Sequence, residues 1–424
     1  MKEALKKWLR SHGITRSHAN ALQYWVPYNF MDGKAWTPQS ITIETTLRCN
    51  LSCQMCPLDL PRMIHDHAQP EYVQERRKAE MTTAEILGVI DDVANMGVRE
   101  MTLTGGELFL RRDAMELIEH AKRRGRRLCV NTNGWFLTRA HARRLVEIGV
   151  DAMSISVDGP DEVHDFIRRG NGSFRRICEG LALLKEEKEA LGKQNPKIGI
   201  SVTLSSLNQG RFSEVIDALH PYNISSMDFD FMFFTDEDSV HRTEAMIPLP
   251  VHRKEENQIL PDELRNVDAD IMFAEMQKAR EKAQQHGIFI DFGPPFKTRD
   301  QVHKRFHDVG YTFVDKCFYP WKAARINPYG DVYSCSIDVA FGNIHEASFS
   351  KLWNGEAYQT FRRTLKSHRL FPKCSKCCAL NNDLWNHLPA FGKAITDETF
   401  TTPSSTQQLG QQARVEETHA PSAK

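Results

Sequence analysis

The 424-residue sequence has no excess of charge of either sign, because 55 lysines and arginines balance 55 aspartates and glutamates. Proteins that bind nucleic acid mainly through its phosphates carry a basic excess, so no nucleic-acid partner is expected. No run of about eighteen or more apolar residues occurs, and we expect no membrane span. The first residues, MKEALKKWLRSHGITRSHANALQYW, lack the apolar core and cleavage site of a signal peptide. These absences predict a cytoplasmic protein in a reducing compartment.

A reducing compartment disfavours disulfides, and the ten cysteines are instead grouped on short spacings. Three lie at positions 49–56, three lie at 374–378, and four are scattered. Clustered thiols indicate a metal or iron–sulfur site. Burial as a small apolar side chain explains Cys129 and Cys178, but it explains the two clusters poorly.

Short β-branched segments alternate with amphipathic segments between residues 39 and 232. The expected strands are 40–45, 100–105, 127–132, 151–157, 197–204 and 227–233, and the expected helices are 82–97, 111–124, 138–148, 174–192 and 211–219. This alternation predicts a parallel sheet with right-handed crossovers. We therefore predict an α/β fold with a partial (β/α)6, TIM-like barrel. A helix over 270–286 and a strand over 288–292 are expected to complete it.

The composition divides the chain into four expected parts. They are an N-terminal helical extension (1–38), the partial barrel (39–300), a small cysteine-rich module of β-hairpin and helix (310–398) and a polar, disordered tail (399–424). Two polar insertions, 58–80 and 234–268, follow strands. Insertions at that end of a barrel lie over its binding face, so both are candidate lids.

The first cysteine cluster lies in the loop TLRCNLSCQMC, directly after the first expected strand. Cys49, Cys53 and Cys56 are spaced to wrap one face of a cubic 4Fe-4S cluster. A cluster ligated only by protein takes four cysteines, and no fourth cysteine follows nearby. One iron is therefore expected to keep an open position, where a small molecule can bind and be activated.

A CxxxCxxC loop after the first strand resembles the cluster loop of the radical S-adenosylmethionine (SAM) superfamily. The resemblance covers roughly residues 39–232 and implies that the amine and carboxylate of SAM chelate the open iron. It further implies that a reductant such as flavodoxin or ferredoxin drives cleavage of SAM. The products would be methionine and a 5′-deoxyadenosyl radical, which abstracts hydrogen from a substrate.

Other residues match the positions at which this family binds SAM. Two glycines allow close approach of the backbone, and the acid after them can accept from the SAM amine. The resemblance implies that polar residues at strand ends approach the SAM ribose. It also implies that an arginine pairs with the SAM carboxylate and that a methionine contacts the adenine. The implied residues are Gly105, Gly106, Glu107, Asn131, Asn133, Ser156, Asp158, Arg168 (with Arg169 as second choice) and Met55. A solvated charge at a helix end is the alternative for either arginine.

The second cysteine group fits one fully ligated site formed by Cys317, Cys335, Cys374 and Cys377. Gly330, in NPYGD, predicts a hairpin turn that brings the first two together, and CSKC supplies the other two. The spacing alone permits a structural zinc. The pattern resembles the SPASM/Twitch auxiliary-cluster domains of radical SAM enzymes. Cysteines for a second auxiliary cluster are absent, so the resemblance implies one auxiliary 4Fe-4S cluster.

Three residues are candidates for the chemistry on the substrate. Asp228 and Asp230 share one face of the sixth strand by alternation and are candidate bases for an oxidation, although that face can equally be solvated. Cys378 is unassigned. It could be an alternative ligand, a hydrogen-atom donor in an epimerisation, or a packed thiol.

The substrate class is predicted from the short segment before the first strand. Only about 38 residues precede it, too few for a leader-peptide-binding domain. A small molecule such as a sugar or aminocyclitol, undergoing dehydrogenation, epimerisation or a related change, is therefore favoured. Modification of a peptide or protein is the alternative. An iron–sulfur electron carrier and a zinc-binding protein without catalysis are the alternatives of another class.

Overall fold

The computed structural model describes residues 16–56, 80–249, 262–335, 337 and 339–380. The expected tail, the end of the cysteine-rich module, the start of the N-terminal extension and nearly all of the first candidate lid lie outside these residues. No helix in the described ranges is both long enough and apolar enough to cross a membrane.

A ten-stranded sheet in the described residues organises the fold, in the order β10-β9-β8-β1-β2-β3-β4-β5-β6-β7. Seven parallel strands follow the chain: β1 (Ser40–Glu44), β2 (Glu100–Thr104), β3 (Leu128–Thr132), β4 (Ala152–Ser156), β5 (Lys197–Leu204), β6 (Ser226–Phe231) and β7 (Phe289–Gly293). The two end strands, β10 and β7, do not pair, so the sheet is open. The predicted α/β partial barrel is confirmed, and β7 is the closing strand expected over 288–292, paired in parallel with β6.

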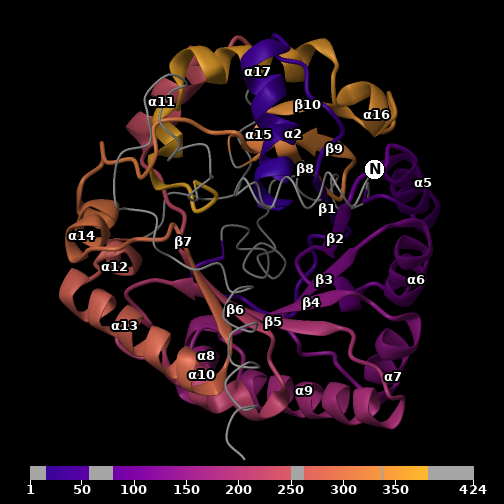
Figure 1. The fold of residues 1–424 in the computed structure, drawn as a ribbon, viewed down its shortest axis with the longest axis vertical. Coiled ribbons are helices and arrows are strands. Elements are labelled where there is room, and N and C mark those ends of the chain that lie inside the picture. The colour runs from indigo at the N-terminus through magenta and orange to yellow at the C-terminus, as the bar shows by residue number, and fades with distance from the viewer. Residues whose placement is uncertain (1–15, 57–79, 250–261, 336, 338, 381–424) are drawn as a thin grey trace, which may run out of the picture. The chain divides into compact units, whose positions relative to one another are not determined.

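Helices connect consecutive parallel strands and cover the outer side of the sheet (Figure 1). They are α5 (Thr83–Asn95), α6 (Ala114–Arg124), α7 (Arg139–Ile148), α8 (Asp161–Arg168), α9 (Ser173–Ala190), α10 (Glu214–Leu219) with η2 (His220–Tyr222), and α13 (Ala269–His286). In α5, Thr82 and Glu85 form a capping box that satisfies two main-chain amides, and the buried residues recur at helical spacing. Short η1 (Leu108–Leu110) follows β2. Helix α8 was not expected from the sequence.

Strand alternation separates an apolar outer face from a polar inner face. In β6, Met227, Phe229 and Phe231 are buried, whereas Asp228 is exposed and Asp230 is half-buried. Because helices cover the outer face, the two aspartates lie on the inner face of the curved sheet. The face that the sequence left undecided is therefore the interior.

The cysteine-rich module begins with a hairpin that continues the barrel sheet. Strands β8 (Ala323–Ile326) and β9 (Asp331–Tyr333) are antiparallel, and β8 pairs in parallel with β1. The predicted turn is present, with Gly330 at a φ of 86°. Strand β10 (Ala340–Asn343) pairs with β9, and α16 (Phe349–Leu352), α17 (Glu356–His368) and η3 (Pro372–Lys376) follow. The module thus shares hydrogen bonds with the barrel rather than standing apart from it.

Further helices lie outside the barrel repeats, most of them in segments for which the sequence predicted no helix or strand. The insertion over 234–268 contains α11 (Glu237–Met246) and α12 (Asp262–Arg265), and α14 (Arg299–His307) follows β7. Short α15 (Tyr319–Lys322) leads into β8. Helix α2 (Arg16–Phe30) packs on this part of the chain, with the ring of Tyr28 4.8 Å from that of Trp321.

Candidate functional site

The loop that carries Cys49, Cys53 and Cys56 follows β1 and is held by hydrogen bonds on two sides. On one side, the Glu80 carboxylate accepts from the main-chain amide of Leu47 at 2.8 Å and from the Thr46 hydroxyl at 3.0 Å. On the other, the main-chain amide of Gln54 donates to the Ile167 carbonyl of α8 at 2.9 Å. The loop therefore spans from the start of α5 to the end of α8. Glu80 gave no signal in the sequence, because its partners lie more than thirty positions away.

Gly105 and Gly106 let this loop lie directly against the end of β2. The Gly106 amide donates to the Thr46 carbonyl at 2.7 Å, and the Glu107 amide donates to the Arg48 carbonyl at 2.8 Å. A β-carbon on Gly106 would stand 2.5 Å from two carbonyl oxygens of the loop, and one on Gly105 would overlap the Thr46 carbonyl. The close approach predicted for these glycines is thus made by the cluster loop.

Glu107 is buried at 1% exposure and connects β2 to β3. One carboxylate oxygen accepts from the Phe109 amide at 3.0 Å and the Thr132 hydroxyl at 2.8 Å, and the other accepts from the Asn133 amide at 2.7 Å. Burial raises the pKa of Glu107. A carboxylate offers about four acceptor positions, so one remains for an external donor. Acceptance from the SAM amine stays a prediction.

The asparagines after β3 lie at different depths. The side-chain amide of Asn133 donates to the Asn50 side chain at 2.9 Å and approaches Cys49 Sγ at 3.9 Å, so it contacts the cluster loop. Asn131 lies two residues before Asn133, on the inner face of β3, and its side-chain oxygen accepts a hydrogen bond from the Cys129 thiol at 3.6 Å. Ser156 ends β4 on the inner face and is half-buried, and Met55 is buried within the cluster loop.

Asp158 and Arg168 form a buried ion pair at 2.5 Å, which the sequence did not predict. Asp158 is fully buried, and its second oxygen accepts from the Thr203 amide at 2.9 Å. Arg168 also reaches Cys53 Sγ at 3.8 Å. Arg169 is exposed and caps α8 in the left-handed conformation, so Arg168 is the arginine that faces the thiols.

The positions of two thiols in this loop, Cys49 and Cys53, favour their protonated forms in the metal-free protein. Burial raises the pKa of Cys49 to about 11, and burial also raises that of Cys53 against the opposing charge of Arg168. Iron binding must therefore release these protons. The surroundings suit thiolates, because the Leu51 amide donates to Cys49 Sγ at 3.5 Å and Arg168 approaches Cys53. Hydrogen bonds to ligand sulfurs of this kind stabilise iron–sulfur clusters.

The second group of thiols comes from separate elements of the module. Cys317 precedes α15 and accepts from the Tyr319 amide at 3.4 Å, as Cys49 does from its own second neighbour. Cys335 follows β9, and Cys374 lies buried in η3. Burial raises the pKa of Cys374 well above its usual range, and the charges of Cys317 and Cys335 add to the effect.

Within the described residues, no group of three or more Cys, His, Asp or Glu side chains is arranged to hold a single metal ion. A cluster of several irons binds each thiolate at a separate corner, so its ligands lie further apart than those of one ion. The fit of both sites to clusters rests on the buried thiols and on the donors directed at their sulfurs.

Two of the three residues proposed for the chemistry lie together where β7 ends. A β-carbon on Gly293 would overlap the Asp230 carboxylate and lie 3.7 Å from the Cys378 carbonyl. The pKa of the Cys378 thiol is raised by its hydrogen bond to Cys377 and by burial, and the negative charge of Asp230 raises it further. The inner face of β6 is thus adjacent to the last cysteines of the module.

A third carboxylate, Asp291, joins Asp228 and Asp230. Parallel pairing of β6 with β7 places Asp291 opposite Asp228. Burial, and then the charges of Asp228 and Asp291, raise the pKa of Asp230 to about 6. Partial desolvation on the inner face, and then the charge of Asp291, also raise the pKa of Asp228. Asp291 was missed, although alternation in the segment IFIDF placed it on the face opposite to Phe292.

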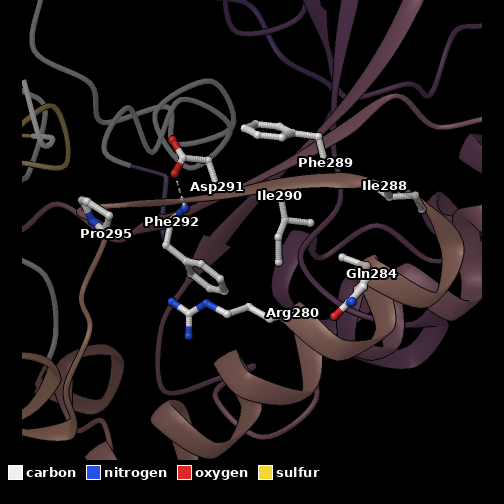
Figure 2. Close-up of a pocket in the computed structure, with 9 residues that line it drawn as sticks. Arg280, Gln284, Ile288, Phe289, Ile290, Asp291, Phe292 and Pro295 are labelled. Carbon is white, nitrogen blue, oxygen red and sulfur yellow. Dashed lines mark hydrogen bonds between the residues drawn. The ribbon is translucent and has the colours of Figure 1, made fainter. Parts of the chain in front are cut away.

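A cavity of about 380 Å³ lies between β7 and α13; Asp291 is among its lining residues, whereas Asp228 and Asp230 are not. In Figure 2, Ile290 and Phe292 point toward Arg280 of α13, whereas Phe289 and Asp291 point to the opposite face of the strand. The guanidinium of Arg280 lies 4.9 Å from the Phe292 ring. This cavity belongs to the helix-covered side, and the candidate site lies on the inner side.

Comparisons with known proteins agree with this arrangement. Residues 43–191 match the family model of the radical SAM superfamily, and residues 317–378 match SPASM, an iron–sulfur cluster-binding domain. The chain is 27% identical to an AdoMet-dependent heme synthase of Methanosarcina barkeri, over 80% of this chain and 88% of that protein. It is 24% identical to a PqqA peptide cyclase of Gluconobacter oxydans, over 86% of this chain and 89% of that protein.

Solved structures share the fold at low identity, and one of them serves as an example. SuiB of Streptococcus suis, in a crystal structure bound to S-adenosylmethionine, superposes with a TM-score of 0.54. The two sequences are 12% identical, and the match covers 85% of this chain and 78% of SuiB.

Proposed function

Because this chain belongs to the radical SAM superfamily and carries a SPASM iron–sulfur domain, we propose that it abstracts hydrogen from a small-molecule substrate on the inner face of its sheet. Its cofactors are SAM and 4Fe-4S clusters. Cys49, Cys53 and Cys56 would hold the SAM cluster, which supplies the electron that cleaves SAM to a 5′-deoxyadenosyl radical. The auxiliary cluster, which supplies an electron acceptor, would be held by Cys317, Cys335, Cys374 and Cys377.

Residues around the first cluster would position SAM. Three protein donors occupy three of the roughly four acceptor positions of Glu107, and the remaining one suits the SAM ammonium group. Arg168 lies beside Cys53 and carries the charge that a carboxylate requires. Because Asp158 fixes the Arg168 side chain, the guanidinium is oriented before SAM binds.

Asp230 is the observation that carries the proposal of an oxidation. Converting a carbinol or amine carbon to a carbonyl or imine removes one hydrogen atom, one proton and one electron. The hydrogen atom leaves with the 5′-deoxyadenosyl radical, and the electron leaves to the acceptor. Asp230 would take the proton, since a carboxylate whose pKa is raised to about 6 is matched to base catalysis near neutral pH.

The charge of the inner face restricts the substrate. Three carboxylates, Asp228, Asp230 and Asp291, line neighbouring strands there. A polyanionic substrate would be repelled, whereas an amine or a polyhydroxylated molecule would find hydrogen-bond acceptors. Aminocyclitols and amino sugars satisfy both conditions.

Isotope transfer tests the proposal. Reconstituted protein, SAM and dithionite would be incubated anaerobically with deuterated aminocyclitols and amino sugars, and 5′-deoxyadenosine analysed by mass spectrometry. We expect deuterium in 5′-deoxyadenosine and an oxidised product. Cys53→Ala abolishes SAM cleavage, whereas Asp230→Asn keeps deuterium transfer and loses the oxidised product. Full product formation by Asp230→Asn would show that another group takes the proton.

Peptide modification is the second candidate, because one relative is named a peptide cyclase and covers most of this chain. The same assay with deuterated peptides separates the two candidates. Deuterium transfer from peptides alone would make the small-molecule assignment wrong. An electron carrier without catalysis would produce no 5′-deoxyadenosine with any of these substrates.

A further inference from the structure

Arg305, on α14, is a buried cation without a carboxylate partner. Its exposure is 2%. Nη2 donates to the main-chain carbonyls of Met232 at 2.8 Å and Phe231 at 3.4 Å, while Nε and Nη1 have no hydrogen-bond partner among the residues that the structure describes. Burying an unpaired charge costs several kcal/mol, so a compensating anion is expected nearby.

The groups that interact with the charge of Arg305 include two cysteine thiols, those of Cys378 and Cys377. Burial lowers the pKa of Arg305, but an arginine guanidinium stays protonated in proteins, so Arg305 is charged at neutral pH. The Phe234 ring lies 5.4 Å from the guanidinium and also favours a cation, whereas the Lys376 ammonium is a like charge that interacts with Arg305.

Lys376 fixes the cysteine segment against the helix that carries Arg305. Its ammonium donates to the carbonyls of Lys304 at 3.3 Å, Tyr311 at 3.4 Å and Asp308, all at the C-terminal end of α14. Cys377, a predicted cluster ligand, is the next residue. The relative positions of Arg305 and this ligand are therefore set by direct contacts.

We propose that Arg305 is a positioning residue for electron transfer, whose buried charge offsets the auxiliary cluster and raises its reduction potential. Four thiolates give a 4Fe-4S cluster a net negative charge, and the reduced form carries one negative charge more than the oxidised form. A fixed cation in a water-poor site therefore favours the reduced form. The proposal rests on the assignment of the auxiliary cluster, and it makes that cluster a better electron acceptor for the oxidation proposed above.

A redox titration of the auxiliary cluster alone tests this. The full chain with Cys49, Cys53 and Cys56 changed to Ala retains only the second site, whose reduced form is followed by electron paramagnetic resonance against a series of mediators. In this background Arg305→Gln keeps a donor for the β6 carbonyls and removes the charge, and Arg305→Lys keeps the charge. Arg280→Met is the matched control, because it removes a guanidinium that contacts Phe292 and no thiol.

We expect Arg305→Gln to lower the midpoint potential by at least about 59 mV, which is a tenfold change in a one-electron equilibrium. Arg305→Lys and Arg280→Met are expected to stay near the parent value. An unchanged potential in Arg305→Gln with a full iron content would overturn the proposal.

If Arg305→Gln does not assemble its cluster, Arg305→Met provides the same comparison with an apolar side chain. Failure of both neutral variants to assemble, with normal assembly in Arg305→Lys, would also overturn it, because the charge would then serve assembly and not potential. None of these readouts depends on the substrate. A shifted potential without deuterium transfer would therefore leave this inference standing while the proposed oxidation fails.

Discussion

Replacing Asp230 with Asn should stabilise the folded protein while it removes the proposed base. Burial, and then Asp228 and Asp291, raise the pKa of Asp230 from 3.8 to about 6. The fold thus favours the protonated carboxyl. The stability that this proton contributes is fully present below pH 3.8 and is lost as the pH rises through about 6. A shift of roughly two units corresponds to about 3 kcal/mol at neutral pH.

The isosteric amide removes this dependence, so the advantage of Asp230→Asn should grow with pH. Between pH 5 and pH 7.5 the linkage relation gives an increase of about 1.4 kcal/mol in the difference between the two proteins. Anaerobic urea denaturation of the reconstituted proteins, followed by circular dichroism, measures it. Asp161→Asn is the control, because it removes an exposed carboxylate from the start of α8.

The refuting result is a stability difference that does not change between these two pH values. It would mean that Asp230 ionises in the folded protein as it does in the unfolded chain, and the argument for a base matched to neutral pH would fail with it. A gain of similar size and pH dependence in Asp161→Asn would show that overall charge, rather than the inner face, controls stability.

Three further changes test the site. Gly106→Ala should cost about 1–3 kcal/mol and lower iron content, because its β-carbon meets two carbonyls of the cluster loop, whereas Gly88→Ala, with open space around it, should retain full iron. Asp158→Asn should lower the free energy of unfolding by about 3–5 kcal/mol in urea denaturation and weaken SAM binding in calorimetry, because it leaves Arg168 without its ion-pair partner. Glu162→Gln removes a carboxylate from an exposed ion pair and should change neither quantity. Cys335→Ala should keep some SAM cleavage. If the auxiliary cluster also stabilises the segments around it, amide hydrogen exchange in this variant should be faster than in the parent protein in η3 and α14 but unchanged in β3. Exchange rates equal to those of the parent in all three elements would refute this stabilising role.

The repeated strands and the thiol spacings could be predicted because each depends on neighbours in sequence. Alternation placed Asp228 and Asp230 on one face, and the hairpin at Gly330 followed from local turn chemistry. The pairing of β8 with β1 could not be predicted in this way, since nothing local to Ala323–Ile326 specifies a partner almost three hundred residues earlier.

The roles of the polar residues around SAM were harder to predict for the same reason. Motif position indicated Glu107 and Asp158 as ligand contacts, whereas the structure shows that most of their acceptor capacity holds the protein together. Glu80 and Arg305 became visible only when distant segments were brought into contact. A sequence pattern thus identifies where a site lies, and only tertiary contacts show which atoms remain free for a ligand.

The open sheet and the auxiliary thiols are physically connected. Cys317 and Cys335 flank the β8–β9 hairpin, which pairs with β1 at one side of the barrel opening. Cys374 lies in η3 and Cys377 directly follows it. This segment is held at the other side by α11, where the Lys373 amide donates to the Thr243 hydroxyl at 3.0 Å, and by α14. Ligation of one cluster by all four would therefore join the two sides of the opening that strand pairing leaves apart. Asp230 lies at one of these sides, so the same ligation would fix the distance between the electron acceptor and the proposed base. The groups that accept the proton and the electron would then lie on the same side of the substrate.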